Sequence, residues 1–277
     1  MNLVIAFILH FGSEKDTIVC LKSIFKYNYV DIVIIDNDPE QKLQLPNEYS
    51  NVSIIRTGGK LGFASAFNFA VHKKRKHYHQ LLLILNNDMI LTNDALSNLC
   101  SCMVDHDIGA IGPCIPYAKY PSGIWACGGK IDKIFLNIGG VMPSGSKNPY
   151  EVDYLPGAAI LISFNAWDKV GGLPEKYFLA FEEAEFALRI KRMGLKIMVN
   201  PNSIILHQVG MSSDRQPMYI YNSIRNRIRF SKYLYGEITG ILWGVLVTMD
   251  QLRRKKNFFF GSEYGLNQLK MKLMVIH

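Results

Sequence analysis

A carboxylate and two short amides follow a run of five aliphatic residues in the first third of the chain. The run is LLLIL at residues 81–85, and Asn86, Asn87 and Asp88 come directly after it. Carboxylate oxygen is a hard ligand of the kind that Mg²⁺ and Mn²⁺ bind, and substrate phosphates commonly complete the coordination shell. Asp88 is therefore a candidate metal ligand in a segment suited to bind a diphosphate. The alternative is a simple polar turn, because strands commonly end in Asn and Asp.

Three glutamates are crowded at the start of a predicted helix in the sequence FEEAEFALRIKRMG. They are Glu182, Glu183 and Glu185. Neighbouring carboxylates raise one another's pKa, and a glutamate with a raised pKa can accept a proton from a hydroxyl group. One of the three is therefore a candidate general base. The alternative is electrostatic, because the helix dipole favours acidic side chains at a helix N-terminus.

A single histidine, His207, follows a short apolar run in the sequence LHQVGMSS at residues 206–213. A neutral imidazole is a common metal ligand. A lone histidine after a strand is more often a structural residue, so its role depends on which groups lie near it in the fold.

Aliphatic runs alternate with helical patterns over the first hundred residues, and this alternation predicts how the groups are positioned. Continuous apolar strands between helices are typical of a parallel sheet covered on both faces. In such sheets ligands bind outside the carboxyl ends of the strands, where Asp36 and residues 86–88 both fall. Strands are predicted at residues 3–9, 32–35, 52–55 and 81–85, and helices from about Glu14 to Tyr27 with Ser13 as N-cap, from about 63 to 76, and after Thr92 as N-cap.

The rest of the chain predicts a smaller addition to this sheet. Residues 108–163 are rich in Gly and Pro with short strand-like runs, which indicates antiparallel strands. A helix is predicted from about Glu182 to Met193, and two short strands after it lead to His207. The fold class is therefore α/β, with a Rossmann-like half, a mostly parallel central sheet, a small antiparallel addition and a helical C-terminal tail.

The composition fits one large core or two smaller ones, because 49% of the 277 residues are hydrophobic and 19% are charged. The apolar N-terminus MNLVIAFILHFG has no basic leader and no small-residue cleavage site, so we interpret it as a buried strand rather than a signal peptide. The five cysteines form no CxxC pair and no zinc-binding spacing. Such an odd, scattered set is typical of a reducing cytoplasm.

The C-terminal tail carries the whole net charge of +8, because residues 215–277 contain 11 Lys and Arg against 3 Asp and Glu. Its apolar run, ITGILWGVLVTM at 238–249, is shorter than the roughly 20 residues that span a bilayer. An RRKK run and three phenylalanines follow, so we expect association with an anionic membrane surface through residues 238–260. One alternative is a helix packed on the preceding domain. Another is nucleic-acid binding, but the tail contains no known nucleic-acid module, so we expect no nucleic acid as a partner.

The order and spacing of the motifs resemble glycosyltransferase family 2 from about residue 3 to about residue 235. The resemblance is strongest to its bacterial rhamnosyltransferase-like and galactofuranosyltransferase-like members. GKLGFASAFNFA is similar to the family's NxGFAxxxN segment, and NND occupies the place of its metal-binding DxD-type motif. LPGAAILISFNAWDKVGGLPEKYF looks like the stretch before the acceptor site, and FEEAEFALR matches the ED motif. The segment that begins at His207 is similar to the family's HxxGxS motif, and the segment from Tyr219 to Asn226 resembles its YYxxRN motif.

This resemblance implies an inverting, metal-dependent glycosyltransferase with the GT-A fold. Its donor would be a UDP- or dTDP-sugar and its acceptor a glycan or lipid-linked glycan, in the synthesis of bacterial surface polysaccharide such as O-antigen or capsule. Rhamnosyl transfer is one candidate reaction, and the inner, cytoplasmic face of the plasma membrane is the expected location. The catalytic domain would be residues 1–214, with a nucleotide-binding half at 1–107 and an acceptor-side half at 108–214, and 215–277 would be the tail. The implied roles are general base for Glu183, nucleobase contact for Asp36, Mg²⁺ or Mn²⁺ ligands for Asp88 and His207, and substrate contacts for Lys60, Asn87 and Glu182.

The sequence departs from the family's pattern at four places. Glu182-Glu183 replaces the ED pair, which keeps the carboxylate and adds one methylene. Lys60 replaces the usual Asn, and His10-Phe11 replaces a polar-aromatic-Asn segment at the end of the first strand. Asp88 is the only carboxylate of its motif, which makes a histidine ligand more useful.

Two other classes of function are compatible with parts of this pattern. A nucleotidyltransferase could use a similar sheet and metal, but it would not explain the acidic helix start together with HxxGxS. A sugar-nucleotide-binding protein without catalytic activity is the other alternative, should the glutamate substitution abolish turnover.

Overall fold

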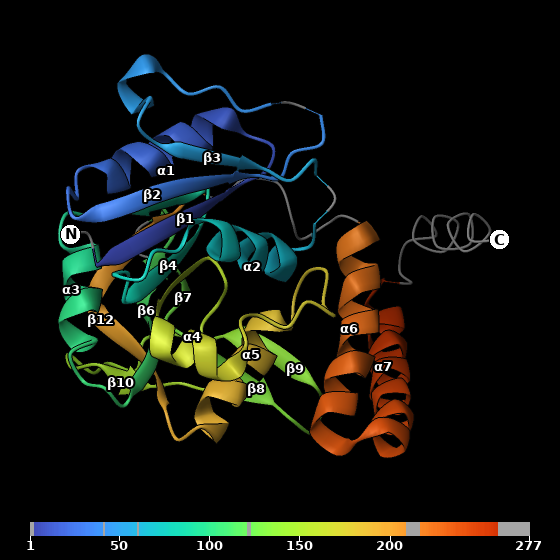
Figure 1. Cartoon of the computed structure of the whole chain (residues 1–277). Coiled ribbons are helices and arrows are strands. Elements are labelled where there is room, and N and C mark those ends of the chain that lie inside the picture. The colour runs from blue at the N-terminus through green and yellow to red at the C-terminus, as the bar shows by residue number, and fades with distance from the viewer. Residues whose placement is uncertain (1–2, 41, 60, 121–122, 209–216, 260–277) are drawn as a thin grey trace.

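The computed structural model describes residues 3–40, 42–59, 61–120, 123–208 and 217–259 (Figure 1). Four parallel strands form the first part of its central sheet, as the sequence predicts. They are β1 (Val4–His10), β2 (Val30–Asp36), β3 (Ser53–Arg56) and β4 (Leu81–Asn86).

Two helices cover opposite faces of these strands. Helix α1 (Glu14–Phe25) packs with Ala6 and Ile8 of β1 in one core, and α2 (Phe63–Lys74) packs with Ile5 and Phe7 in the other. Side chains of both orientations are therefore buried, which is why the strands are continuously apolar. The predicted N-cap of α1 is confirmed, because the Ser13 side chain accepts a hydrogen bond from the backbone N–H of Asp16.

The remaining strands extend the same sheet and add a small second one. They are β5 (Met89–Leu91), β6 (Ile108–Pro116), β7 (Ile124–Ala126), β8 (Gly129–Asp132), β9 (Asn137–Gly140), β10 (Tyr150–Glu151), β11 (Ala159–Ser163) and β12 (Lys196–His207). The helices of this part are η1 (Asn47–Tyr49), α3 (Ala95–Cys102), α4 (Phe164–Val170) and α5 (Glu182–Arg192). The large sheet has ten strands in the order β10-β12-β6-β11-β4-β1-β2-β3, with β5 beside β12 and β7 beside β6, while β8 and β9 pair separately. Strand β11 is antiparallel to both neighbours, so its first residue, Ala159, pairs with Leu85 near the carboxyl end of β4.

Three local features differ from what the sequence predicts. Thr92 is not the N-cap of α3, which begins after Asp94, because the Thr92 hydroxyl instead donates to the Ile204 carbonyl of β12 at 2.8 Å. The two short strands expected before His207 are the single irregular strand β12. The structure also joins Cys114 and Cys127 in a disulfide, which their spacing did not indicate.

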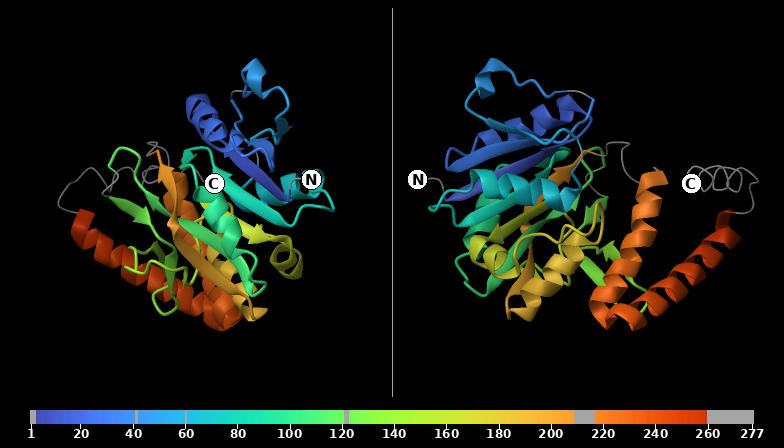
Figure 2. Two further views of the ribbon diagram at one scale, coloured as in Figure 1. Left: turned by 90° about the vertical axis from the view of Figure 1, so that its left-hand side faces the viewer. Right: turned by 45° about the vertical axis from the view of Figure 1, so that its right-hand side comes forward.

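A helical hairpin stands beside the α/β part of the molecule (Figures 1 and 2). It consists of α6 (Pro217–Tyr235) and α7 (Glu237–Phe259), which pack together next to their connection and diverge beyond it (Figure 2). The hairpin is anchored to the β8–β9 turn, because Tyr235 donates to the Lys133 carbonyl and Trp243 to the Ile134 carbonyl. Within the described residues, neither this hairpin nor any other helix meets the length and hydropathy required of a bilayer span.

Candidate functional site

Asp88 and His207 lie side by side although 119 positions separate them in the sequence. His207 Nε2 is 3.0 Å from Asp88 Oδ2. The strands bring the two residues together, because Asp88 lies in the turn between β4 and β5, and β5 pairs with β12 so that Met89 is opposite His207. The backbone carbonyl of Asp88 also accepts a hydrogen bond from the N–H of Gln208 at 2.8 Å. The two predicted metal ligands therefore occupy one corner of the sheet.

The other polar atoms of this pair are available to a ligand. Asp88 Oδ1 and His207 Nδ1 are buried and have no hydrogen-bond partner among the described residues. Buried polar atoms are nearly always paired, and a carboxylate oxygen with an imidazole nitrogen suits a divalent cation. The described part of the chain holds no group of three or more His, Cys, Asp or Glu side chains that could bind a metal. A cation held by this pair would thus have positions open to water and substrate phosphates, as Mg²⁺ commonly does.

The side chain of Asn87 ties the same turn to the end of β1. Its amide donates to Thr17 Oγ1 at 2.9 Å and, at longer range, to the carbonyls of Ser13 and Phe11. The Thr17 hydroxyl also contacts His10 Nδ1 at 2.6 Å, and burial lowers the pKa of His10. Asn87 therefore fixes the loop after β1, and its contact with substrate stays a prediction.

Asp36 is buried at the end of β2 and holds the loop that follows it. Its Oδ2 accepts a hydrogen bond from the Leu43 N–H at 3.1 Å and lies 3.5 Å from Arg56 Nε, while Oδ1 faces the Asp38 N–H at 3.4 Å. A carboxylate has about four lone-pair sites, so Asp36 can accept one further hydrogen bond. The other residue predicted for this side of the site, Lys60, lies outside the described residues.

The three crowded glutamates have two different environments. Glu185 is fully buried and paired: it accepts hydrogen bonds from Tyr177 Oη at 2.5 Å and Arg189 Nη2 at 2.6 Å, and Lys176 Nζ is 2.7 Å away. Lys176 and Tyr177 were not singled out in the sequence, although Arg189 at the i+4 position could have indicated a partner for Glu185. The paired carboxylate is structural, which leaves Glu182 and Glu183 as candidates for chemistry.

Glu182 and Glu183 each have one buried carboxylate oxygen without a hydrogen-bond partner among the described residues. Burial raises the pKa of both side chains, and the neighbouring Glu183 raises the pKa of Glu182 further. Hydrogen bonds from the backbone N–H groups of Glu183 itself and of Gly157 act against burial and lower the pKa of Glu183. A partly desolvated glutamate with a raised pKa and two stabilising backbone donors is suited to accept a proton.

A short backbone segment, residues 155–158, connects the glutamates to the turn that carries Asp88. Gly157 donates to Glu183, and the carbonyl of the next residue, Ala158, accepts a hydrogen bond from the N–H of Asn86 at 2.9 Å. Both groups therefore lie at the carboxyl end of β4, where parallel sheets bind ligands. No sequence pattern assigned this bridging role, although the Pro-Gly pair before an aliphatic strand could have indicated a loop there.

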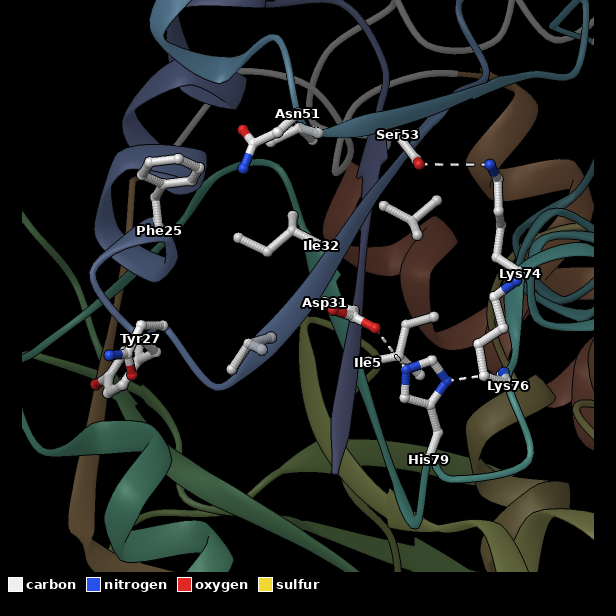
Figure 3. Close-up of a pocket in the computed structure, with 14 residues that line it drawn as sticks. Ile5, Phe25, Tyr27, Asp31, Ile32, Asn51, Ser53, Lys74, Lys76 and His79 are labelled. Atoms are coloured by element: carbon white, nitrogen blue, oxygen red, sulfur yellow. Dashed lines mark hydrogen bonds and ion pairs between the residues drawn. The ribbon is translucent and has the colours of Figure 1, made fainter. Parts of the chain in front are cut away.

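A hollow of about 560 Å³ lies elsewhere, at the amino ends of the first strands (Figure 3). It is lined by residues such as Ile5, Asp31 and His79. His79 is buried, with Nε2 2.8 Å from Asp31 Oδ2 and Nδ1 accepting from the Lys76 N–H at 2.9 Å. Because this is the edge opposite to the carboxyl ends of the strands, we place the candidate active site at β4 and not in this hollow.

Solved structures with this arrangement of sheet and helices are GT-A glycosyltransferases. GalNAc-T7, crystallised with UDP, GalNAc and Mn²⁺, matches with a TM-score of 0.65 over 81% of this chain and 47% of its own, at 16% identity. The mannosyltransferase PcManGT from Pyrobaculum calidifontis, in complex with GDP-Man and Mn²⁺, matches with a TM-score of 0.59 over 99% of this chain and 80% of its own, at 13% identity. The chain therefore has the GT-A fold, although it spans about half the length of the GalNAc-T7 chain.

The family model of glycosyltransferase like family 2 matches residues 8–231. The chain therefore belongs to glycosyltransferase family 2 and is an enzyme of the GT-A type. The hexosyltransferase Agl10 of low-salt glycan biosynthesis in Haloferax volcanii is 21% identical, over 94% of this chain and 89% of its own. The N-acetylglucosaminyl-diphospho-decaprenol L-rhamnosyltransferase of Mycobacterium tuberculosis is 24% identical, over 66% of each chain. The match to the family model covers most of α6, including the segment from Tyr219 to Asn226.

Proposed function

We propose that this protein is an inverting glycosyltransferase, with Glu183 as general base and with Asp88 and His207 as the residues that hold a divalent cation. The observation that supports this most is the arrangement around residues 155–158. The backbone N–H of Gly157 faces Glu183, a half-buried glutamate with one buried oxygen that has no partner among the described residues, and Ala158 contacts the segment that carries the Asp88–His207 pair. A proton acceptor and a cation site at one sheet edge are the two parts that sugar transfer from a nucleotide requires.

The chemistry follows from these side chains. Glu183 accepts the proton of the acceptor hydroxyl while the hydroxyl oxygen attacks the anomeric carbon of the donor sugar. The bond from that carbon to the nucleoside diphosphate breaks on the opposite side. This single in-line displacement inverts the anomeric centre and needs no protein nucleophile. Glu182 contacts the acceptor rather than the same proton, because adjacent residues on a helix point about 100° apart. Mg²⁺ or Mn²⁺ bound by Asp88 and His207 would act as a Lewis acid on the diphosphate.

The donor base is expected to be uracil or thymine, because the carboxylate of Asp36 can accept a hydrogen bond from the pyrimidine N3–H. In the presence of Mn²⁺, UDP or dTDP should therefore raise the melting temperature of the protein more than GDP does. A thermal-shift panel of the three nucleotides and of UDP- and dTDP-sugars measures this preference. Equal or larger stabilisation by GDP, the nucleotide of the PcManGT complex, would contradict the assignment.

The names of two relatives support a proposal for the acceptor and the setting. One is a rhamnosyltransferase whose name includes a diphospho-decaprenol acceptor, and another is a hexosyltransferase of glycan biosynthesis. We propose a glycan or lipid-linked glycan acceptor in bacterial surface polysaccharide synthesis, including O-antigen and lipopolysaccharide, with rhamnose as a candidate sugar. The catalytic domain would be residues 1–214, with halves at 1–107 and 108–214, acting at the inner, cytoplasmic face of the plasma membrane.

Helix α7 presents six large apolar residues away from the rest of the protein. Its side toward α6 is formed by small residues: a Cβ on Gly240 would lie 2.5 Å from Lys232 Cα, and one on Gly244 would lie 3.0 Å from Ile228 Cα. The opposite side is 39–78% exposed and consists of Ile238, Ile241, Leu242, Val245, Leu246 and Met249. A helix that packed only on its own domain would bury its large aliphatic side chains, so this orientation favours a lipid surface as the partner. The basic tail suits anionic lipid.

Replacing two leucines of this face, Leu242→Ser with Leu246→Ser, is expected to weaken binding to anionic vesicles by about tenfold, because each leucine loses apolar area that lipid would cover. Vesicle sedimentation measures the binding, and transfer to a water-soluble acceptor analogue should stay unchanged. Val104→Ser is the control, since Val104 is 76% exposed but lies after α3. Wild-type vesicle binding by the double variant would show that α7 is not the anchor.

A further inference from the structure

The segment that presents Glu182 and Glu183 has an uncommon backbone conformation. Ala180 and Phe181, the two residues before α5, have φ angles of +69° and +78°. Residues other than glycine rarely adopt this left-handed region, and they keep it only where the surrounding structure holds them. Because Phe181 directly precedes the two glutamates, their direction depends on the contacts that hold this segment.

Asn226 of α6 makes the side-chain contacts that hold it. Its amide Nδ2 donates to the carbonyl of Leu179 at 2.7 Å and to the carbonyl of Ala180 at 2.9 Å. The side chain is fully buried, so both hydrogen bonds are shielded from water. One turn further along α6, the ring of Phe230 packs against Phe181 with a centroid distance of 5.4 Å.

The other end of the segment is fixed by α2. The backbone N–H of Phe63 donates to the carbonyl of Phe178 at 2.9 Å. Residues 178–181 are thus held by α2 at their start and by Asn226 at the two carbonyls nearest the glutamates. Without the Asn226 amide, those two carbonyls would lose their donor, and the part of the segment next to Glu182 would be the part released.

We propose that Asn226 is a positioning residue, which directs the Glu183 carboxylate toward the acceptor hydroxyl by clamping residues 179 and 180. This inference rests on the proposed function, in which Glu183 is the general base. Asn226, the last residue of the segment in α6 that resembles YYxxRN, would thus affect the transfer reaction without contacting the reacting atoms.

The chain offers a matched control one helical turn away. Asn222 is also buried, and its Oδ1 accepts a hydrogen bond from Arg225 Nη2 at 2.7 Å. The Oδ1 of Asn226 faces the same arginine, with Arg225 Nε at 3.4 Å. The difference is that Asn222 Nδ2 has no hydrogen-bond partner among the described residues. Asn226→Asp and Asn222→Asp therefore make the same chemical change, but only the first removes donors from the segment before the glutamates.

Asn226→Asp is expected to lower kcat by about 10²-fold, because a displacement of about 1 Å in a reacting group can have that effect. The affinity for UDP or dTDP, measured by calorimetry with Mn²⁺, should stay close to that of the wild type, and Asn222→Asp should keep its kcat. Rates are measured well below the melting temperature of each variant. Asn226→Leu, which adds no charge, should show the same loss of kcat and serves if the aspartate variant does not fold.

A double variant separates positioning from a general structural effect. If Asn226 acts through Glu183, then Asn226→Asp in the Glu183→Gln background should cause little further loss, because the two changes remove the same function. A wild-type kcat in Asn226→Asp, an equal loss in Asn222→Asp, or full additivity with Glu183→Gln would overturn the inference. A wild-type rate in Glu183→Gln alone would overturn the proposed function instead.

Discussion

Glu183→Gln is expected to lower the rate of sugar transfer by about 10² to 10⁴, the usual loss when a general base is removed. Glutamine keeps the size of the side chain and can remain near the Gly157 N–H, but it cannot accept a proton at neutral pH. Nucleotide affinity should change little, because the Asp88–His207 pair is a separate part of the site. Single-turnover transfer from a UDP- or dTDP-sugar, beside calorimetric titration of the nucleotide, measures both quantities.

Two further variants define the role of each glutamate. Glu183→Asp should keep activity, since it restores the residue usual in the family. Glu182→Gln should mainly raise KM for the acceptor. If Glu182→Gln is inactive while Glu183→Gln transfers sugar at the wild-type rate, the two roles are exchanged. If both variants remain fully active, the acidic pair is only a charged helix start.

The raised pKa values also predict a pH dependence. The base must be ionised, so kcat should rise with pH through a value above the ordinary glutamate pKa of about 4.3, and Glu183→Gln should lack this rise. Because burial raises the pKa in the folded state, the folded protein binds more protons than the unfolded chain between the two pKa values. Stability therefore falls as pH rises through that range, and Glu183→Gln should be more stable than the wild type at neutral pH but not near pH 4.

Much of the fold of residues 1–107 follows from the sequence because its strands are covered on both faces. Their apolar runs are continuous, and β1, β2, β3 and β4 lie within a few residues of their predicted bounds. The second half was predicted only as an antiparallel addition, because its strands pair with partners distant in sequence. Strand β11 lies between β4 and β6, and no local pattern specifies such a pairing.

In the candidate site, too, some features follow from local sequence and others depend on tertiary contacts. The position of Asp88 directly after a buried strand was enough to predict that it lies at the carboxyl edge of the sheet. The contact between Asp88 and His207 depends on the β5–β12 pairing, and the separation of Glu185 from Glu183 depends on Lys176 and Tyr177. These are tertiary contacts, so a charged cluster in a sequence does not show which member is already paired.

The Asp88 carboxylate is expected to carry the metal dependence of nucleotide binding. Asp88→Ala should weaken binding of UDP or dTDP in the presence of Mn²⁺ by at least about 10- to 100-fold, since loss of outer-shell groups alone commonly has that effect. Without Mn²⁺ the variant and the wild type should bind the nucleotide equally weakly. The melting temperature of the free protein should hardly change, because Asp88 Oδ1 has no protein partner among the described residues and only the contact with His207 is lost.

Asp94→Ala is the matched control for this variant. Asp94 lies six positions further along the chain, is exposed before α3 and makes no side-chain capping hydrogen bond, so its removal changes the net charge equally without touching the site. Calorimetric titrations of both variants, each with and without Mn²⁺, separate the loss of a ligand from the loss of a negative charge. His207→Ala should show the same metal-specific loss as Asp88→Ala, because the two side chains are in contact. Mn²⁺-dependent binding that survives both substitutions would place the cation elsewhere and leave the Asp88–His207 pair as a structural contact between β5 and β12.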